Sequence, residues 1–145
     1  MRNLTTESGP PFLLGGKLGD LRIRSDRDLA TLVSKRLPAT TIQSLVRGGL
    51  TNAEAYDLII PRRTLAHRIA KNEPLSTDES DKAVRVARIA AMAEQTFGEP
   101  EPAWRWLRKS KRQFEGRTPL QMLATEAGAR LVEEVIVRID DGMFG

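Results

Sequence analysis

Cysteine is absent from this sequence of 145 residues, and histidine occurs once, at His67. Without cysteine there is no disulfide framework and no thiolate metal site. A lone histidine argues against a structural zinc site, because such a site takes several Cys or His ligands. The composition fits a reducing cytoplasm, and we expect neither a metal nor any other cofactor.

Long apolar runs are absent as well. A membrane helix needs about 20 consecutive apolar residues, and every apolar run here is far shorter. Pro10 and Pro11 interrupt the N-terminal stretch where the apolar core of a signal peptide would lie. We therefore expect no membrane partner, and we interpret residues 1–25 as a flexible leader.

A recognisable catalytic set is also missing. A single histidine with no convincing nucleophile near it does not make an acyl-transfer triad. The glycines of LLGGKLGD lack the spacing and the preceding strand of a phosphate-binding loop. Two acidic pairs, Glu133–Glu134 and Asp140–Asp141, lie near the C-terminus, but adjacent residues on a helix point in different directions. We predict no catalytic residues and a protein that is not an enzyme.

The positive charge is unevenly distributed. Residues 1–98 carry 15 Lys and Arg against 11 Asp and Glu, which gives +4, whereas residues 99–145 carry 8 of each sign, which gives zero. The first part is therefore the better candidate for binding a polyanion.

Helical periodicity dominates from about residue 26 onward, and no segment alternates convincingly as a strand would. Start and stop signals predict five helices in the first part of the chain: from Ser25 or Asp26 to before Pro38, within 39–50, over 51–60, over 63–71, and from Ser76 or Thr77 to Phe97. They predict three more in the second part: around Trp104 and Leu107, after Thr118, and from Thr125 or Glu126 onward. We predict an all-α fold with a helical domain at 26–98 and a small helical module at 99–145, separated by the break GEPEP.

The last predicted helix carries one apolar stripe. Residues at the steps expected for a single helix face are Leu131, Val132, Val135, Ile136 and Ile139. Gly142 is a plausible end signal for this helix.

The turn IIPRR joins two short predicted helices, and this arrangement suggests a helix-turn-helix. In that motif the first residues of the second helix face base edges, and the arginine fork suits guanine. Thr51, at the start of the first helix, lies where free backbone N–H groups can bind a phosphate. The DNA-binding candidates are Thr51, Arg62, Arg63, Thr64, His67, Arg68 and Lys71.

The alternative for this segment is a solvated helix at a domain surface. Leu65 and Ile69 are four residues apart and can both face the core, which leaves Arg63, His67 and Lys71 on other faces. His67 is expected to be a surface or groove residue, since no second metal ligand is in sight.

A second basic run, WRWLRKSKRQFEGR, covers residues 104–117 and contains two tryptophans. Aromatic residues among basic ones can bind single-stranded nucleic acid. We favour the alternative that Trp104 and Leu107 anchor the core while the charges cover the outside. Some of these charges can still help to hold a phosphate or an acidic partner.

The C-terminal segment GRTPLQMLATEAGARLVEEVIVRIDDGMFG resembles the C-terminal signature of the MbcA/ParS/Xre antitoxins, the partners of RES-domain toxins. The matching positions are Gly116, Arg117, Pro119, Leu120, Thr125, Gly128, Val132, Ile139, Gly142 and Phe144. Upstream, IPRRTLAHR and LSTDESDKAVRVARI resemble the Xre-type helix-turn-helix half of the same family. The resemblance covers residues 40–145.

The resemblance implies an antitoxin that forms a homodimer, binds its own operator DNA and inhibits a RES toxin that consumes NAD⁺. In this family the C-terminal region covers the entrance to the toxin's active site. The toxin-facing candidates that the resemblance implies are Gly128, Leu131, Glu134, Arg138, Asp141, Met143 and Phe144.

The charge of the last helix fits this expectation. A site for an anionic dinucleotide should have a basic mouth, and residues 126–141 carry five acidic residues against two arginines, a net of −3. Met143 and Phe144 would add an apolar tip, unless they fold back on their own domain. The rival hypothesis is a plain helix-turn-helix regulator whose C-terminal module only dimerises, and a neighbouring RES-type reading frame would distinguish the two.

Overall fold

The computed structural model describes residues 26–142, which are helices, turns and loops without a strand. The helices are α3 (Asp26–Ser34), α4 (Thr41–Gly48), α5 (Asn52–Leu58), α6 (Arg62–Ala70), α7 (Thr77–Phe97), α8 (Pro100–Leu107), the 3₁₀ helix η1 (Arg112–Phe114), α9 (Pro119–Met122) and α10 (Glu126–Asp140). The predicted all-α fold is confirmed. The predicted leader, residues 1–25, and the predicted tip, Met143 and Phe144, lie outside the described residues.

Thr51 and Thr118, which the sequence predicts at helix starts, each belong to a capping box. Thr51 and Glu54 exchange side-chain and backbone hydrogen bonds at the start of α5, and Thr118 and Gln121 do so at α9. The α5 helix ends at Leu58, two residues earlier than predicted. The GEPEP break is shorter than expected, because α8 already begins at Pro100, where a helix tolerates proline.

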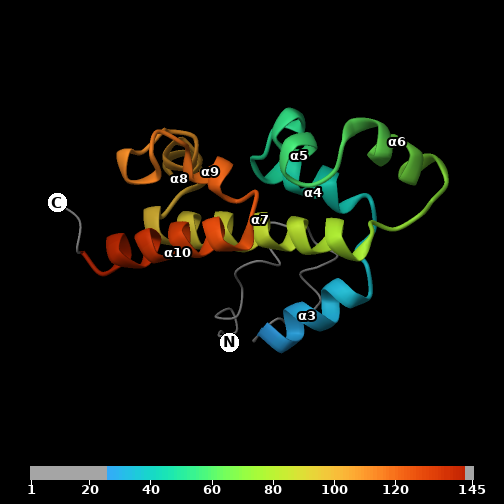
Figure 1. The fold of residues 1–145 in the computed structure, drawn as a ribbon, viewed down its shortest axis with the longest axis horizontal. Helices are drawn as coiled ribbons and strands as arrows, with labels where there is room; N and C mark the ends of the chain where they lie inside the picture. The colour runs from blue at the N-terminus through green and yellow to red at the C-terminus, as the bar shows by residue number, and fades with distance from the viewer. Residues whose placement is uncertain (1–25, 143–145) are drawn as a thin grey trace.

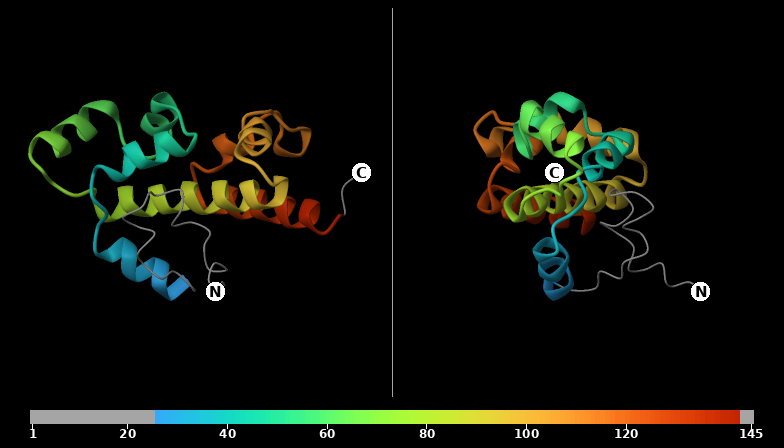
Figure 2. Two further views of the ribbon diagram at one scale, coloured as in Figure 1. Left: turned by 180° about the vertical axis from the view of Figure 1, so that it is seen from behind. Right: turned by 90° about the vertical axis from the view of Figure 1, so that its right-hand side faces the viewer.

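The long helix α7 lies at the centre of the molecule (Figure 1). It contacts α3, α4, α8 and α10. Figure 2 shows α3 on one side of α7 and the α4–α6 and α8–α9 groups together on the other side. The boundary expected at residue 98 therefore falls at the end of a helix that both halves share. No helix within 26–142 is long and apolar enough to cross a membrane.

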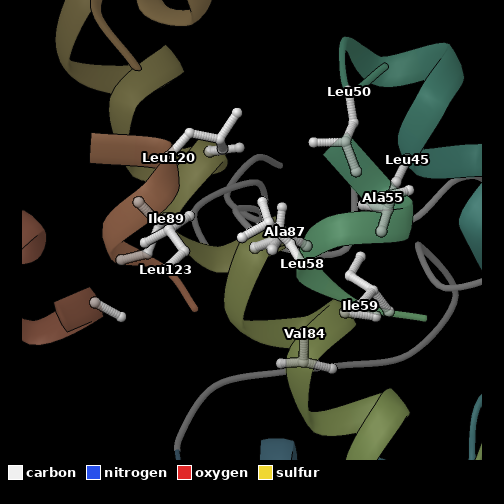
Figure 3. Packing of buried hydrophobic residues seen from close by; sticks show 14 of the residues in the cluster. Leu45, Leu50, Ala55, Leu58, Ile59, Val84, Ala87, Ile89, Leu120 and Leu123 are labelled. Carbon is white, nitrogen blue, oxygen red and sulfur yellow. The ribbon is translucent and has the colours of Figure 1, made fainter. Parts of the chain in front are cut away.

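One continuous core joins the two halves through α7. Val84 and Ala87 of α7 lie beside Leu58 and Ile59, which come from the α5 end (Figure 3). Farther along α7, Ile89 lies beside Leu120 and Leu123, which come from the α9 region (Figure 3). The alanines along α7 let these neighbours approach closely: Ala83, Ala87 and Ala93 have no exposed surface. The folding of each half is therefore tied to the other.

Charged contacts fix α10 along the C-terminal half of α7. Arg85 donates to the backbone oxygens of Leu123 and Ala124 at 3.2 and 3.3 Å, and to a Glu126 carboxylate oxygen at 3.2 Å. Arg88 pairs with Glu133 at 2.9 Å. Since the later positions on α7 meet later positions on α10, the two helices run in the same direction.

A second set of contacts joins α8 to the start of α5. The Arg108 guanidinium donates two hydrogen bonds to the Glu54 carboxylate, both 2.8 Å, and one to the Gly49 carbonyl at 2.6 Å. Gly49 has a φ of 137°, and a Cβ there would collide with the Trp104 ring. The Trp104 N–H in turn donates to Glu94 of α7 at 3.0 Å. These contacts hold the α4–α5 corner against α8.

One residue of the predicted Leu65–Ile69 pair and one residue of the predicted α10 stripe are exposed. Ile69 of α6 is 42% exposed, so only Leu65 of the predicted pair is buried. Leu131 of α10 is 48% exposed, although the rest of its stripe packs inward. Val132, Val135 and Ile136 are buried in the common core, whereas Leu131 lies at the margin of the stripe, because the stripe is wider than the face that the neighbouring helices cover.

We predict that Arg85→Met will lower the free energy of unfolding by about 3 kcal/mol. Arg85 is buried, and its loss leaves the Leu123 and Ala124 carbonyl oxygens without their donor. Urea unfolding followed by circular dichroism measures the change. The control is Lys82→Met, which removes a more exposed i,i+4 pair with Asp78 on the same helix and should change the free energy by less than about 0.5 kcal/mol. Equal stability of Arg85→Met and the unchanged chain would contradict the role given to Arg85.

Candidate functional site

Helices α5 and α6 form the predicted helix-turn-helix. The turn between them is short, and its residues Ile59 and Ile60 are buried, which fixes the angle at which α6 leaves the core. Pro61 precedes the first turn of α6 with an extended backbone. The α6 helix lies at the edge of the molecule, at the end opposite to α10 (Figure 1). Its outer surface is therefore open to a large partner.

Four of the predicted DNA-binding side chains project from α6 or its end without a partner. Arg62, Arg63, His67 and Lys71 are all exposed. Within residues 26–142 none of them forms an ion pair or a side-chain hydrogen bond. Unpaired arginines at the start of a second helix are suited to base edges and phosphates. The structure thus brings these four candidates together on one accessible helix.

Arg68 and Thr64 are placed differently from the other candidates. Both are half-buried. The Arg68 guanidinium makes two hydrogen bonds to the Glu79 carboxylate, at 2.9 and 3.0 Å, and lies 3.5 Å from a Glu73 oxygen. Glu79 also belongs to the capping box at the start of α7. In this structure Arg68 anchors α6 to α7, which is a positioning contact.

Thr51 does not present a free N–H group. Its backbone N–H donates to the Glu54 carboxylate at 2.9 Å, and its hydroxyl accepts from the Glu54 N–H at 3.1 Å. Partial burial raises the pKa of Glu54, but the Arg108 guanidinium and the Thr51 N–H outweigh burial and leave that pKa below its ordinary value. A carboxylate therefore occupies the end of α5 where the sequence predicted a phosphate.

The outer face of α10 contains most of the predicted partner-facing residues. Leu131, Glu134, Arg138 and Asp141 are exposed, and they fall at helical spacing on one side. Val137 lies on the same exposed side and is 46% exposed. Sequence analysis missed Val137 because the pattern alone did not show which apolar positions α7 covers. We call this set, with Val137, the α10 outer face.

The α10 outer face is less acidic than the sequence of the helix suggested. Glu126 and Glu133 pair with arginines of α7, and Asp140 accepts from the Thr96 hydroxyl at 3.3 Å. Arg130 also pairs with Glu126, at 3.8 Å, so the charges left on the outside are Glu134 and Asp141 against Arg138, a net of −1. Its distinctive feature is instead a pair of exposed apolar side chains, Leu131 and Val137.

Gly128 lies inside the molecule. It is buried near the start of α10, where a Cβ would collide with the Met122 carbonyl oxygen. Its N–H donates to the Thr125 hydroxyl at 2.9 Å. The close approach expected at this glycine is therefore made within the chain, between α9 and α10.

The tryptophans of the second basic run are largely covered. Trp104 and Leu107 are buried, as predicted for core anchors. The Trp106 ring packs against Phe97 at 5.7 Å between centroids, and the Lys111 ammonium lies 4.9 Å from its centre. These contacts leave no ladder of open rings for stacking bases. The part of the chain that the structure describes also contains no cluster of three or more metal-ligating side chains.

Comparisons with known proteins agree on both halves. The model of the antitoxin Xre-like helix-turn-helix domain matches residues 28–88, and that of the antitoxin Xre/MbcA/ParS C-terminal toxin-binding domain matches residues 92–142. The chain is 43% identical over 120 residues to an antitoxin Xre of Pseudomonas putida, which covers 83% of this chain and 76% of that protein.

Two further relatives match shorter regions. A Prs ADP-ribosylating antitoxin of Sphingobium sp. is 29% identical over 90 residues, which covers 56% of this chain and 57% of the relative. An antitoxin Xre of Yersinia enterocolitica is 30% identical over 86 residues, which covers 59% of this chain and 58% of the relative.

We predict that acid will loosen the attachment of α6. Partial burial raises the pKa of Glu79, but Arg68 and the Ser76 hydrogen bonds outweigh it and hold that pKa below its ordinary value of 4.5. A lowered folded-state pKa means that this stabilisation is present above the ordinary pKa and is lost as pH falls through the folded-state pKa. The protection factors of the α6 amides, which are corrected for the intrinsic pH dependence of exchange, should therefore fall toward low pH more steeply than in Glu79→Gln. Equal pH dependence in both proteins would refute this assignment.

Proposed function

Because the chain belongs to the Xre/MbcA/ParS family of antitoxins, we propose that it neutralises a RES-domain toxin through α10 and binds its own operator through α6. The observation that carries the first half is the α10 outer face. It exposes two apolar side chains, Leu131 and Val137, within the segment that matches the toxin-binding domain. A helix face of this kind fits an apolar groove on a partner protein.

The proposed mode of inhibition is occlusion of the toxin's active site. One relative bears the name Prs ADP-ribosylating antitoxin. ADP-ribosylation takes its ADP-ribose from NAD⁺, so a toxin with this chemistry has a cleft for an anionic dinucleotide. Met143 and Phe144, which lie outside the described residues, remain toxin-facing candidates in this proposal. Apolar contacts from Leu131 and Val137 would supply affinity, while Glu134 and Asp141 would pair with basic groups at the rim.

The second half of the proposal is autoregulation. Arg62 and Arg63 stand free at the start of α6 and His67 and Lys71 are accessible on it, which supports docking of α6 in the major groove. Arg68 acts as a positioning residue in this scheme, since it ties α6 to Glu79. Helix-turn-helix proteins commonly bind two half-sites as dimers, and we propose a cytoplasmic homodimer that forms a hetero-oligomer with the toxin.

We expect Leu131→Asp combined with Val137→Asp to abolish neutralisation at equal expression. Placing two carboxylates in an apolar contact should weaken toxin binding by about 2 kcal/mol or more, roughly 30-fold. The measurement is titration of purified antitoxin against the NAD⁺-consuming activity of the toxin encoded by the neighbouring reading frame. Ile69→Asp is the matched control, because it changes an equally exposed apolar residue at the other end of the molecule. Full neutralisation by the double variant would exclude the α10 outer face.

We expect Arg62→Ala and Arg63→Ala each to weaken operator binding by about 1–3 kcal/mol if the side chain reads a base. Neutralisation should stay unchanged, because α6 and α10 lie at opposite ends of the molecule (Figure 1). Fluorescence anisotropy with operator DNA and with a scrambled duplex measures both affinity and specificity. Unchanged operator affinity would remove the residue concerned from the base-contacting set.

A further inference from the structure

We infer that the groove between α4 and α8 binds DNA phosphates, so that the module matching the toxin-binding domain also contributes to the DNA interface. We call this site the α4–α8 groove. It is a cavity of about 470 Å³ lined by Arg47, Gly49, Pro100, Trp104, Arg105 and Arg108, together with Gly48 and Glu101. The inference rests on the proposed operator binding.

The position of the groove follows from the contacts at the α4–α5 corner. Arg108 donates to both the Gly49 carbonyl and the Glu54 carboxylate, so the end of α8 lies within hydrogen-bonding distance of the first turn of α5. In a helix-turn-helix complex the first helix of the motif crosses the phosphate backbone while the second enters the groove. The phosphates that α5 meets would therefore continue past the mouth of the α4–α8 groove.

The helix-turn-helix and helix α8 also lie on the same side of α7. The α4–α6 and α8–α9 groups lie together on one side of α7, and α3 lies on the other (Figure 2). A duplex of B-DNA is a straight, extended ligand that carries a negative charge about every 1.7 Å along its axis. A duplex against α5 and α6 can thus reach α8 without a change in the protein's shape.

The charges of the groove suit an anion. Arg47 contacts only a hydroxyl, that of Ser44 at 3.1 Å, and no carboxylate. Arg105 has a side chain that is 67% exposed, and its one ion pair, with the 84% exposed Glu101 at 3.6 Å, is weak. Arg108 is already neutralised by Glu54, so it positions the groove. Arg47 and Arg105 are the two cations left to contact phosphate, opposed by Glu101.

DNA fits these observations better than the acidic surface of a protein partner does. Helix α10, which would meet the toxin, lies along the opposite half of α7 from α4 and α5 (Figure 1). Arg108, which lines the groove, pairs with Glu54 of α5, and α5 belongs to the helix-turn-helix. It also accounts for part of the second basic run, whose tryptophans are occupied in packing.

The test is the salt dependence of DNA binding by the full chain. The DNA-binding constant K falls with salt concentration, and each lost phosphate contact should make the slope of log K against log salt concentration shallower by about 0.9. This corresponds to about eightfold weaker binding at 0.1 M salt. We expect this loss for Arg47→Gln and for Arg105→Gln, with operator and scrambled DNA affected equally. Arg105→Lys keeps the charge and should restore the slope. Lys35→Gln is the control, because Lys35 is an exposed cation that follows α3 on the other side of α7.

The possible results distinguish a failure of the α4–α8 groove from a failure of the proposed operator binding. If the unchanged protein binds no DNA, the proposed autoregulation fails and the inference falls with it. If it binds operator and Arg62→Ala weakens binding, while both glutamine variants keep the original slope, the α4–α8 groove alone is excluded. A loss of toxin affinity with unchanged DNA binding would show that an acidic protein surface occupies the groove, and would also overturn the inference. Thermal unfolding of each variant checks that the fold is intact.

Discussion

The arrangement of this protein depends on the buried guanidinium of Arg85 on α7. A buried charge is costly unless it is fully paired, and Arg85 meets this condition with two carbonyl oxygens from the end of α9, with Glu126 of α10 and with Asp81 of its own helix. Because Leu123, Ala124 and Glu126 lie close together in the chain, this one side chain holds the link between α9 and α10 against α7. Arg88 and Glu133 then set the direction of α10 along α7. The outer face of α10 is exposed because its inner face is held in this way.

Helix α7 also explains how the two proposed binding surfaces can share a small chain. The helix-turn-helix is attached to its first half through the core and through the Arg68–Glu79 pair, and α10 is attached to its second half. The Arg108–Glu54 contact closes the structure on the other side, between α8 and α5. The shared helix and this contact keep the two surfaces at fixed positions at opposite ends. In the proposed function, toxin and operator can therefore be bound by one antitoxin without competing for the same residues.

Much of the local structure was predictable because its causes are local. Capping boxes at Thr51 and Thr118 start two helices, and Gly49 and Gly98 follow the ends of α4 and α7; each acts within one helical turn and can be recognised in the sequence. The family resemblance was equally legible, and the matches over residues 28–88 and 92–142 confirm it. The apolar pattern was less informative for side chains whose surroundings come from distant segments: Ile69 pairs with Leu65 in the pattern, and Leu131 belongs to the α10 stripe, yet both are exposed.

By itself, the sequence determined the helical class, the order of the helices and the identity of the family, because periodicity, caps and motif residues are properties of neighbouring positions. Only the tertiary structure decided which charges are free. Four charged residues look solvated in the sequence, yet each forms an ion pair with a residue far away in the chain: Arg68, Arg108, Glu126 and Glu133. Arg62, Arg63, Arg47 and Arg105 keep their charge available, and Val137 joins Leu131 outside the core. Such distinctions depend on which distant segment packs against a residue, and periodicity carries no information about that.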